Sequence, residues 1–372
     1  MINKERLLQQ FLQLVQIDSV TGAERQICDE LIGQFQQLGF QVIEDQSAEK
    51  TGHAAGNIVA TLPGNSSGPM IFFTSHMDTV TPGIGIKPRI EGEYVVSDGS
   101  TILGSDDKAG VAAILEGLRV ISESKLPHSG IQVLITAGEE SGLAGSKALD
   151  PGLLKAEYGF ALDSSGKVGD IIVSAPFQAK MKVIVHGRAA HAGVNPEDGL
   201  NAIQVASRAI MRMPIGRIDQ ETTANIGKIE GGQATNIVCP RVEFLAEARS
   251  LVEEKLEQQL AKMQKAITIT AEEFQTAIDV HVEKMYPGYK FSEDDLVTQK
   301  AMEAIKAIGR KPQLKSSGGG SDANAISGYG IPTVNLAIGY EEIHTTNERM
   351  PVEELYKAAE LVVALSQAVL EE

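Results

Sequence analysis

Apolar residues follow two different patterns along the 372-residue chain. In the first part, short apolar runs with little polar alternation are separated by stretches of helical periodicity. The runs lie at residues 57–62, 70–74, 131–136 and 158–162. Such runs are typical of strands buried on both faces of a mostly parallel sheet, with helices on each side. The same pattern returns near the end of the chain, with a helix at 295–308, a strand at 333–338 and a last helix at 352–370.

Two stretches of the first part have a clear apolar face at helical spacing. Residues 1–20 place Leu7, Phe11 and Val15 among charged and glutamine residues, and residues 107–122 repeat the spacing. The first stretch therefore predicts an amphipathic surface helix and not a signal peptide. No stretch reaches the ~20 apolar residues of a membrane span, so the sequence predicts a soluble, cytoplasmic protein.

Between residues 178 and 289 the pattern changes to polar and apolar alternation, as in 180–185 and 242–247. This alternation predicts a sheet with one covered face, which helices at 199–213 and 251–266 are suited to cover. The order of strand, helix, two strands, helix and strand predicts an open-faced α+β sandwich. The expected architecture is thus an α/β domain built from residues 1–177 and 290–372, with an α+β domain inserted at 178–289.

Charge and cysteine content narrow the function classes. The chain has 33 Lys and Arg against 49 Asp and Glu, a net charge of −16, which disfavours nucleic acid and anionic membranes as partners. The two cysteines, Cys28 and Cys239, exclude a disulfide framework and a Cys-rich zinc module, and they fit a reducing compartment.

Chemically active side chains follow several of the predicted strands or precede a helix. They are His76, Asp78, Asp106, Glu139, Glu140, Asp163 and His344. In open α/β sheets the carboxyl ends of strands converge on the ligand crevice, so we expect these residues to meet there. Clustered carboxylates repel one another, and two divalent ions remove that conflict. Imidazole and carboxylate ligands without thiolate favour zinc, with manganese or cobalt as substitutes.

Taken singly, each of these residues has an ordinary structural explanation. An Asp before a helix, such as Asp106, is usually an N-cap, and adjacent glutamates are usually a solvated loop. His53, His128 and His281 are expected to be solvated. Asp322, after a glycine-rich segment, is expected either to support the site or to cap the following helix. Only the coincidence of several such residues with strand ends favours a functional site.

Three motifs resemble those of a known enzyme family. His76–Val80, Gly104–Gly110 and Gly138–Gly142 are similar to the signatures of the co-catalytic zinc peptidases. That family includes peptidase T, glutamate carboxypeptidases, aminoacylases and succinyl-diaminopimelate desuccinylase. The resemblance covers nearly the whole chain, and it is closest to the peptidase T branch through Gly104–Gly110 and Ser317–Asp322.

The resemblance implies a ligand set for two zinc ions. His76 and Asp163 would hold one ion, Glu140 and His344 the other, and Asp106 would bridge both. In the same resemblance Asp78 orients His76, and Glu139 is the general base that activates water.

The inserted domain matches the family's lid or dimerisation domain, which allows a homodimer formed through it. There the resemblance assigns His191 to the oxyanion and Asn225 and Arg249 to the substrate. Gly319, in the glycine-rich segment, is expected to bring backbone close to the substrate.

The function predicted from the sequence is a zinc-dependent exopeptidase that acts on short peptides and removes the N-terminal residue of tripeptides. The alternative on the same metal core is an N-acyl amino acid amidohydrolase or a glutamate-carboxypeptidase-type enzyme. A non-catalytic metal- or peptide-binding protein is disfavoured, because such a protein would normally lack a ligand or the base, and here all are present.

Overall fold

The computed structural model describes residues 1–370. The chain divides into two compact units, of which the first comprises Met1–Ser174, Lys290–Ser317 and the chain from Ser321 onward. The second comprises Ala175–Tyr289 and Gly318–Gly320. No helix within residues 1–370 is both long and apolar enough to cross a bilayer.

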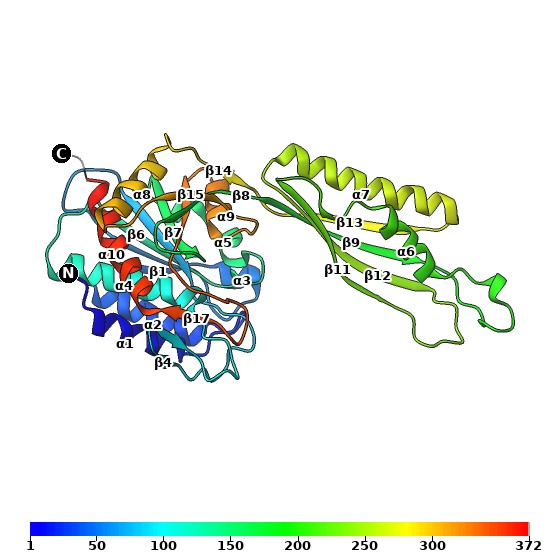
Figure 1. Cartoon of the computed structure of the whole chain (residues 1–372), viewed down its shortest axis with the longest axis horizontal. Helices are drawn as coiled ribbons and strands as arrows, with labels where there is room; N and C mark the ends of the chain where they lie inside the picture. The colour runs from blue at the N-terminus through cyan, green and yellow to red at the C-terminus, as the bar shows by residue number, and fades with distance from the viewer. Residues whose placement is uncertain (371–372) are drawn as a thin grey trace. The chain divides into compact units, whose positions relative to one another are not determined.

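The first unit (Figure 1) is built on a mixed sheet. Its strand order is β1-β2-β6-β3-β7-β16-β8, with β15 beside β8. The central strands β6, β3, β7 and β16 run parallel to one another. β1 and β2 pair antiparallel with their neighbours, and β8 pairs antiparallel with β16 and parallel with β15. The strands are β1 (Gln41–Glu44), β2 (Ile58–Leu62), β3 (Ile71–His76), β6 (Ile131–Thr136), β7 (Tyr158–Ser164), β8 (Asp170–Ala175), β15 (Gln313–Ser316) and β16 (Thr333–Ala337), and the short β14 (Tyr289–Lys290) also pairs with β8. This architecture confirms the predicted α/β fold class.

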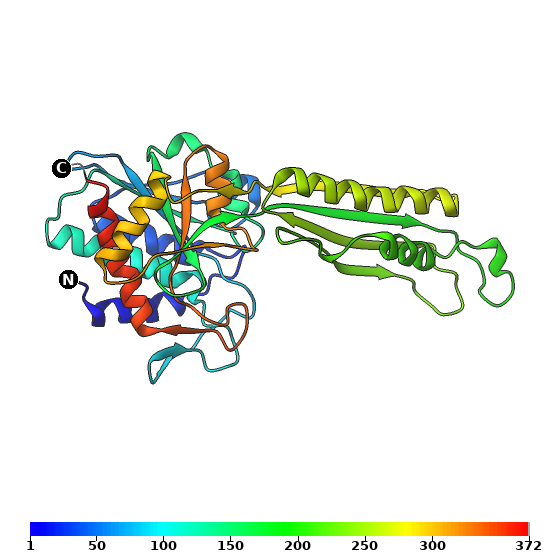
Figure 2. The same cartoon turned by 45° about the horizontal axis from the view of Figure 1, so that its top comes forward.

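Helices cover both faces of this sheet, as Figure 2 also shows. The helices are α1 (Lys4–Val15), α2 (Arg25–Gln37), α3 (Ser47–Thr51), α4 (Ser105–Glu123), α5 (Ala144–Ala148), α8 (Leu296–Ala307), α9 (Asp322–Gly328) and α10 (Val352–Ala368), with a 3-10 turn at Pro151–Leu153. Alternate residues of β3 separate the two faces: Phe73 packs in the large core with α1, α4 and α10, and Phe72 packs with Ile326 of α9. A small sheet of β4 (Arg89–Glu91), β5 (Tyr94–Val96) and β17 (Arg349–Pro351) completes the unit.

The second unit is an antiparallel sheet in the order β10-β11-β12-β9-β13. Its elements are β9 (Phe177–His186), α6 (Ala202–Arg212), β10 (Gly216–Arg217), β11 (Thr222–Gly231), β12 (Arg241–Ser250), α7 (Glu253–Phe274) and β13 (Ile278–Tyr286), with a 3-10 turn at Pro196–Asp198. Side chains of α6 and α7 bury one face, where Val183 and Phe244 are fully buried. On the other face Lys182 and its cross-strand neighbour Leu245 are exposed. The open-faced sandwich predicted from the alternation is therefore confirmed.

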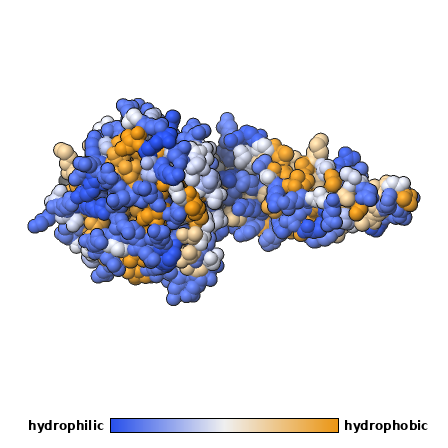
Figure 3. Space-filling model, turned by 90° about the horizontal axis from the view of Figure 1, so that it is seen from below, coloured by the Kyte–Doolittle hydropathy of each residue, from blue (hydrophilic) through white to orange (hydrophobic). Residues whose placement is uncertain are grey.

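The surface is mainly polar in the view of Figure 3, with apolar residues in scattered patches. The exposed apolar residues of the second unit include Ile229, Leu245 and Val280, which are 50%, 39% and 37% exposed.

Candidate active site

The predicted site residues of the first unit meet at the carboxyl ends of its central strands. His76 is the last residue of β3, and Asp163 is the next-to-last residue of β7. Glu139 and Glu140 follow β6, which is parallel to β3. Parallel strands end at one edge of a sheet, and this topology brings together side chains that are far apart in sequence.

Asp106 lies at the centre of this cluster. Its Oδ1 is 3.1 Å from Nε2 of His76, and its Oδ2 is 3.2 Å from Nε2 of His344. The side chain is only 8% exposed. A carboxylate that turns one oxygen toward each of two imidazoles has the arrangement of a ligand bridging two metal ions.

The other predicted ligands complete two groups around Asp106. Nε2 of His344 is 2.9 Å from Oε1 of Glu140, and Nε2 of His76 is 3.8 Å from Oδ1 of Asp163. His76, Asp106 and Glu140 each offer one atom that could bind a metal, and these three atoms lie within 4.8 Å of one another.

A second such group consists of His76, Asp163 and Asp107, a residue to which the resemblance assigned no role. Asp107 is fully buried and its Oδ2 accepts a hydrogen bond of 2.5 Å from Ser75 Oγ. One of its two carboxylate oxygens thus already accepts a hydrogen bond within the protein.

The electrostatics of the cluster fit bound cations. Burial raises the pKa of Asp163 and of Glu139, and neighbouring carboxylates raise both further. Burial alone would lower the pKa of His76, but its contacts with Asp106 and Asp78 outweigh burial and raise it. Divalent ions would relieve the repulsion between these carboxylates, and the imidazole and carboxylate donors suit zinc or a similar ion. The residues present therefore fit a dinuclear metal centre.

A further carboxylate, that of Asp78, contacts residues of this cluster. Its side chain is fully buried, and its Oδ1 accepts the backbone N–H of Glu139 at 3.0 Å and lies 3.5 Å from Nδ1 of His76. Its Oδ2 accepts the N–H of Glu140 at 3.3 Å and the hydroxyl of Thr21 at 2.7 Å. Asp78 thus contacts the predicted ligand His76 and also fixes the turn that carries both glutamates.

Further supporting residues were not predicted from the sequence. The hydroxyl of Tyr340 donates to Oδ1 of Asp163 at 3.0 Å, and the Asn335 amide bonds both backbone groups of Asp163. Glu348 accepts hydrogen bonds from the segment that ends in Asp106. Each lies more than 170 residues from its partner, and nothing in a single sequence signals such a pairing.

Two of the histidines expected to be solvated are not. The imidazole of His53 is 12% exposed, and its Nδ1 lies 3.1 Å from Oε1 of the buried Glu24. The ring also packs against Gly138, where an added Cβ would overlap it. His128 is 6% exposed, whereas His281 is exposed as expected. The local sequence around His53 is polar, but the buried carboxylate that holds it comes from elsewhere in the chain.

The position of Asp322 resolves the two alternatives left open for it. The N-cap of α9 is Ser321, whose side chain and Asn324 form a capping box. Asp322 is buried, and its carboxylate accepts a hydrogen bond from Thr136 at the end of β6. It therefore supports the strand that leads to the glutamates, and the alternative of an N-cap is wrong.

The predicted residues of the second unit are surface residues of that unit. His191 is exposed in a loop, where its Nδ1 accepts the N–H of Gly193 at 3.2 Å, and Asn225 is exposed on β11. Arg249 on β12 forms a two-pronged ion pair with Glu247, with distances of 3.0 and 3.1 Å. Its third nitrogen donates to the carbonyl of Gly318 at 3.3 Å, next to the predicted Gly319.

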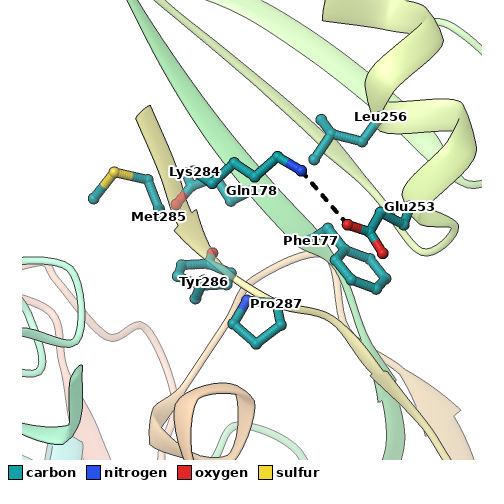
Figure 4. Close-up of a pocket in the computed structure, with 8 residues that line it drawn as sticks. All are labelled: Phe177, Gln178, Glu253, Leu256, Lys284, Met285, Tyr286 and Pro287. Carbon is teal, nitrogen blue, oxygen red and sulfur yellow. Dashed lines mark ion pairs between the residues drawn. The ribbon is translucent and has the colours of Figure 1, made fainter. Parts of the chain in front are cut away.

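The second unit also contains a separate pocket of about 320 Å³ between β9, β13 and α7 (Figure 4). Phe177, Leu256 and Met285 supply apolar walls, and Lys284 lies 3.6 Å from Glu253 at its edge. None of the predicted site residues lines this pocket.

Comparison with known proteins agrees with the geometry. The sequence profile of peptidase family M20/M25/M40 matches residues 72–368. Among solved structures, the aminopeptidase PepT from Bacillus cereus is 58% identical with a TM-score of 0.92, and a tripeptidase from Staphylococcus aureus is 46% identical with a TM-score of 0.96. Each match covers 99% of both chains. Peptidase T of Geobacillus thermodenitrificans is 25% identical over 97% of this chain and 98% of its own. The chain therefore belongs to peptidase family M20/M25/M40, as its three motifs predicted.

Proposed function

We propose that this protein is a metal-dependent aminopeptidase that removes the N-terminal residue of short peptides, with tripeptides as the expected substrates. The observation that carries the proposal is Asp106, which lies between His76 and His344 with one oxygen toward each. The names of the structures that are 58% and 46% identical, an aminopeptidase and a tripeptidase, support the choice of substrate class.

The proposed cofactor is a pair of divalent ions, with zinc as the first choice. His76 and Asp163 would hold one ion, Glu140 and His344 the second, and Asp106 both. When bound, such ions would polarise the scissile carbonyl and lower the pKa of a bound water molecule.

Glu139 is the proposed general base. It precedes the ligand Glu140 on a turn held by Asp78, and burial and nearby carboxylates raise its pKa. A carboxylate with a raised pKa is suited to accept a proton from the attacking water and to return it to the leaving amine. The proposed reaction is peptide hydrolysis without a covalent intermediate.

The second unit is proposed to complete the site. His191 would stabilise the oxyanion, and Asn225, Arg249 and Gly319 would contact the substrate. Support for Arg249 comes from its NH1 group, which donates to the carbonyl of Gly318 beside Gly319. Its Nε and NH2 groups each donate one hydrogen bond to Glu247. We also propose that this unit serves as the lid and as the surface of a homodimer.

A cytoplasmic location is part of the same proposal. Cys28 and Cys239 are both unpaired thiols and both are buried, as expected of a protein in a reducing compartment.

The test is product analysis by mass spectrometry. The zinc-loaded protein is incubated with one tripeptide and with its N-acetylated counterpart, and the Glu139→Gln variant serves as control. Release of the N-terminal residue from the free tripeptide alone supports the proposal. Cleavage of the acetylated peptide instead would move the protein to the acylase or carboxypeptidase branch.

A further inference from the structure

One buried carboxylate outside the ligand set gathers four hydrogen bonds from four consecutive residues. Oε2 of Glu348 accepts the backbone N–H groups of Leu103 and Gly104, each at 2.8 Å. Oε1 accepts the hydroxyl of Ser105 at 2.6 Å and the N–H of Asp106 at 3.0 Å. Glu348 is 1% exposed, so water does not compete for these donors.

These bonds fix the backbone that delivers the bridging carboxylate. Gly104 has a φ of 75°, a left-handed conformation that turns the chain into the first residues of α4. The four hydrogen bonds to the two carboxylate oxygens of Glu348 hold this turn in one orientation. The direction in which Asp106 leaves the backbone, and hence the placement of its oxygens toward His76 and His344, depends on that orientation.

The same side chain also belongs to the loop that carries His344. Glu348 lies four residues after His344, and its N–H donates to the carbonyl of Thr345 at 3.2 Å. The N–H of Asn347 donates to the Thr345 hydroxyl at 3.1 Å, which closes the loop. Glu348 therefore ties the loop of one proposed ligand to the backbone of another, although the two segments are 242 residues apart.

We propose that Glu348 is a positioning residue that sets the metal affinity of the position between Asp106, Glu140 and His344. The inference rests on the metal centre of the proposed function. Asp106 is the proposed ligand of both metal positions, so its displacement weakens binding at both. The position that also uses His344 depends on Glu348 through two ligands, because Glu348 belongs to the loop of His344, and this position weakens more. A residue that held a ligand only through general folding stability would not discriminate between the two positions.

The test measures zinc binding to the metal-free protein by calorimetry, with metal content by mass spectrometry as a second readout. Glu348→Gln keeps the shape but replaces one acceptor oxygen by a donor. We expect both zinc-binding steps to weaken, one of them by ~10–100-fold, the usual effect of losing a group that orients a ligand, and the other by less. Two unchanged binding steps would overturn the proposal, as would equal weakening of both.

Two further variants make the test robust. Glu341→Gln is the matched control, because Glu341 lies near the same loop but pairs with Arg349 and is 40% exposed, so zinc binding should stay at the wild-type level. Ser105→Ala removes a single donor to Glu348 and tests the proposal if Glu348→Gln does not fold; it should weaken the same step less. If wild-type protein binds two zinc ions, Glu348→Gln loses one, and neither cleaves peptides, the positioning role stands and the proposed peptidase function fails.

Discussion

The most informative single substitution is Asp78→Asn, because it changes charge and hydrogen bonding but not shape. The Asp78 carboxylate accepts three hydrogen bonds, from the N–H groups of Glu139 and Glu140 and from Thr21. A carboxamide offers one acceptor oxygen and one NH2 group in these places. In one orientation the NH2 group faces the N–H of Glu140, and in the other it faces the N–H of Glu139 and Nδ1 of His76.

The magnitude follows from this geometry. In either orientation one buried backbone N–H of the glutamate turn loses its acceptor, which costs about 1.5–3 kcal/mol for a bond to a charged group. The Thr21 hydroxyl can rotate and accept instead, so it adds little. We therefore expect the metal-free variant to lose about 2 kcal/mol in free energy of unfolding, which a urea titration measures.

The effect on function should be larger. Displacement of a catalytic group by ~1 Å costs on the order of 100-fold in rate. Zinc affinity should fall less, because Nδ1 of His76 keeps its 3.0 Å contact with the backbone carbonyl of Asp78. The assay is kcat for tripeptide hydrolysis at saturating zinc, together with zinc affinity. Thr21→Val is the control, because it removes one hydroxyl and leaves both N–H bonds of the turn in place. Wild-type stability and wild-type kcat in Asp78→Asn would refute this reasoning.

The remaining predictions concern the base, the second unit, the turn and the metals. Glu139→Gln should keep its metal content and lose ~10²–10⁴-fold in kcat, whereas full activity would remove the assigned base. His191→Ala should lower kcat more than metal content; equal losses would indicate a structural role. Gly138→Ala should destabilise the protein, because Gly138 has a φ of 68° and its added Cβ would overlap His53, and a second His53→Ala change should restore part of the unfolding free energy. Chelation should lower the Tm, because the carboxylates around Asp163 lose their counter-ions, and zinc should restore it.

The sequence predicted the central sheet because its strands are buried on both faces. The unbroken apolar runs form β3, β6 and β7 in the structure. Every residue of β3 (71–76) and of β6 (131–136) is buried. The helix predicted at 107–122 was expected to have one apolar face, yet almost every residue of α4 is buried. The small residues explain the difference: Gly117 lets α10 approach so closely that a Cβ there would lie 2.6 Å from Val362. Periodicity does not detect such packing, because it counts apolar residues and not the absence of side chains.

The second helix of the inserted domain is longer in the structure than the sequence predicted. It was expected to end near residue 266, but α7 continues to Phe274. The residues in between include β-branched Ile and Thr, which have low helix propensity. Packing overrides that preference, because Ile267 is 3% exposed and Thr270 is fully buried and bonded to the carbonyl of Ala266.

At the site, the sequence could predict residues that follow strands, because topology alone brings strand ends together. His76, Glu140 and Asp163 are of this kind. It could not predict the residues that support the site, because Glu348 and Tyr340 are an ordinary loop carboxylate and an ordinary tyrosine until their partners, the Leu103–Asp106 segment and Asp163, are known. The peptidase family was predictable from three short motifs, since these contain three of the five predicted ligands, His76, Asp106 and Glu140.

The supporting residues suggest why a cluster of carboxylates can stay ordered around exchangeable ions. Asp78 anchors the turn of Glu139 and Glu140 by two backbone N–H groups, and Glu348 anchors the turn before Asp106 by three. In both cases a buried carboxylate accepts hydrogen bonds from the backbone, which moves less than a side chain. The two carboxylates share no donor. The repulsion among the ligands therefore acts against two independently fixed turns. Since each turn is held by hydrogen bonds within the protein, we expect metal binding to spend little free energy on ordering these two turns.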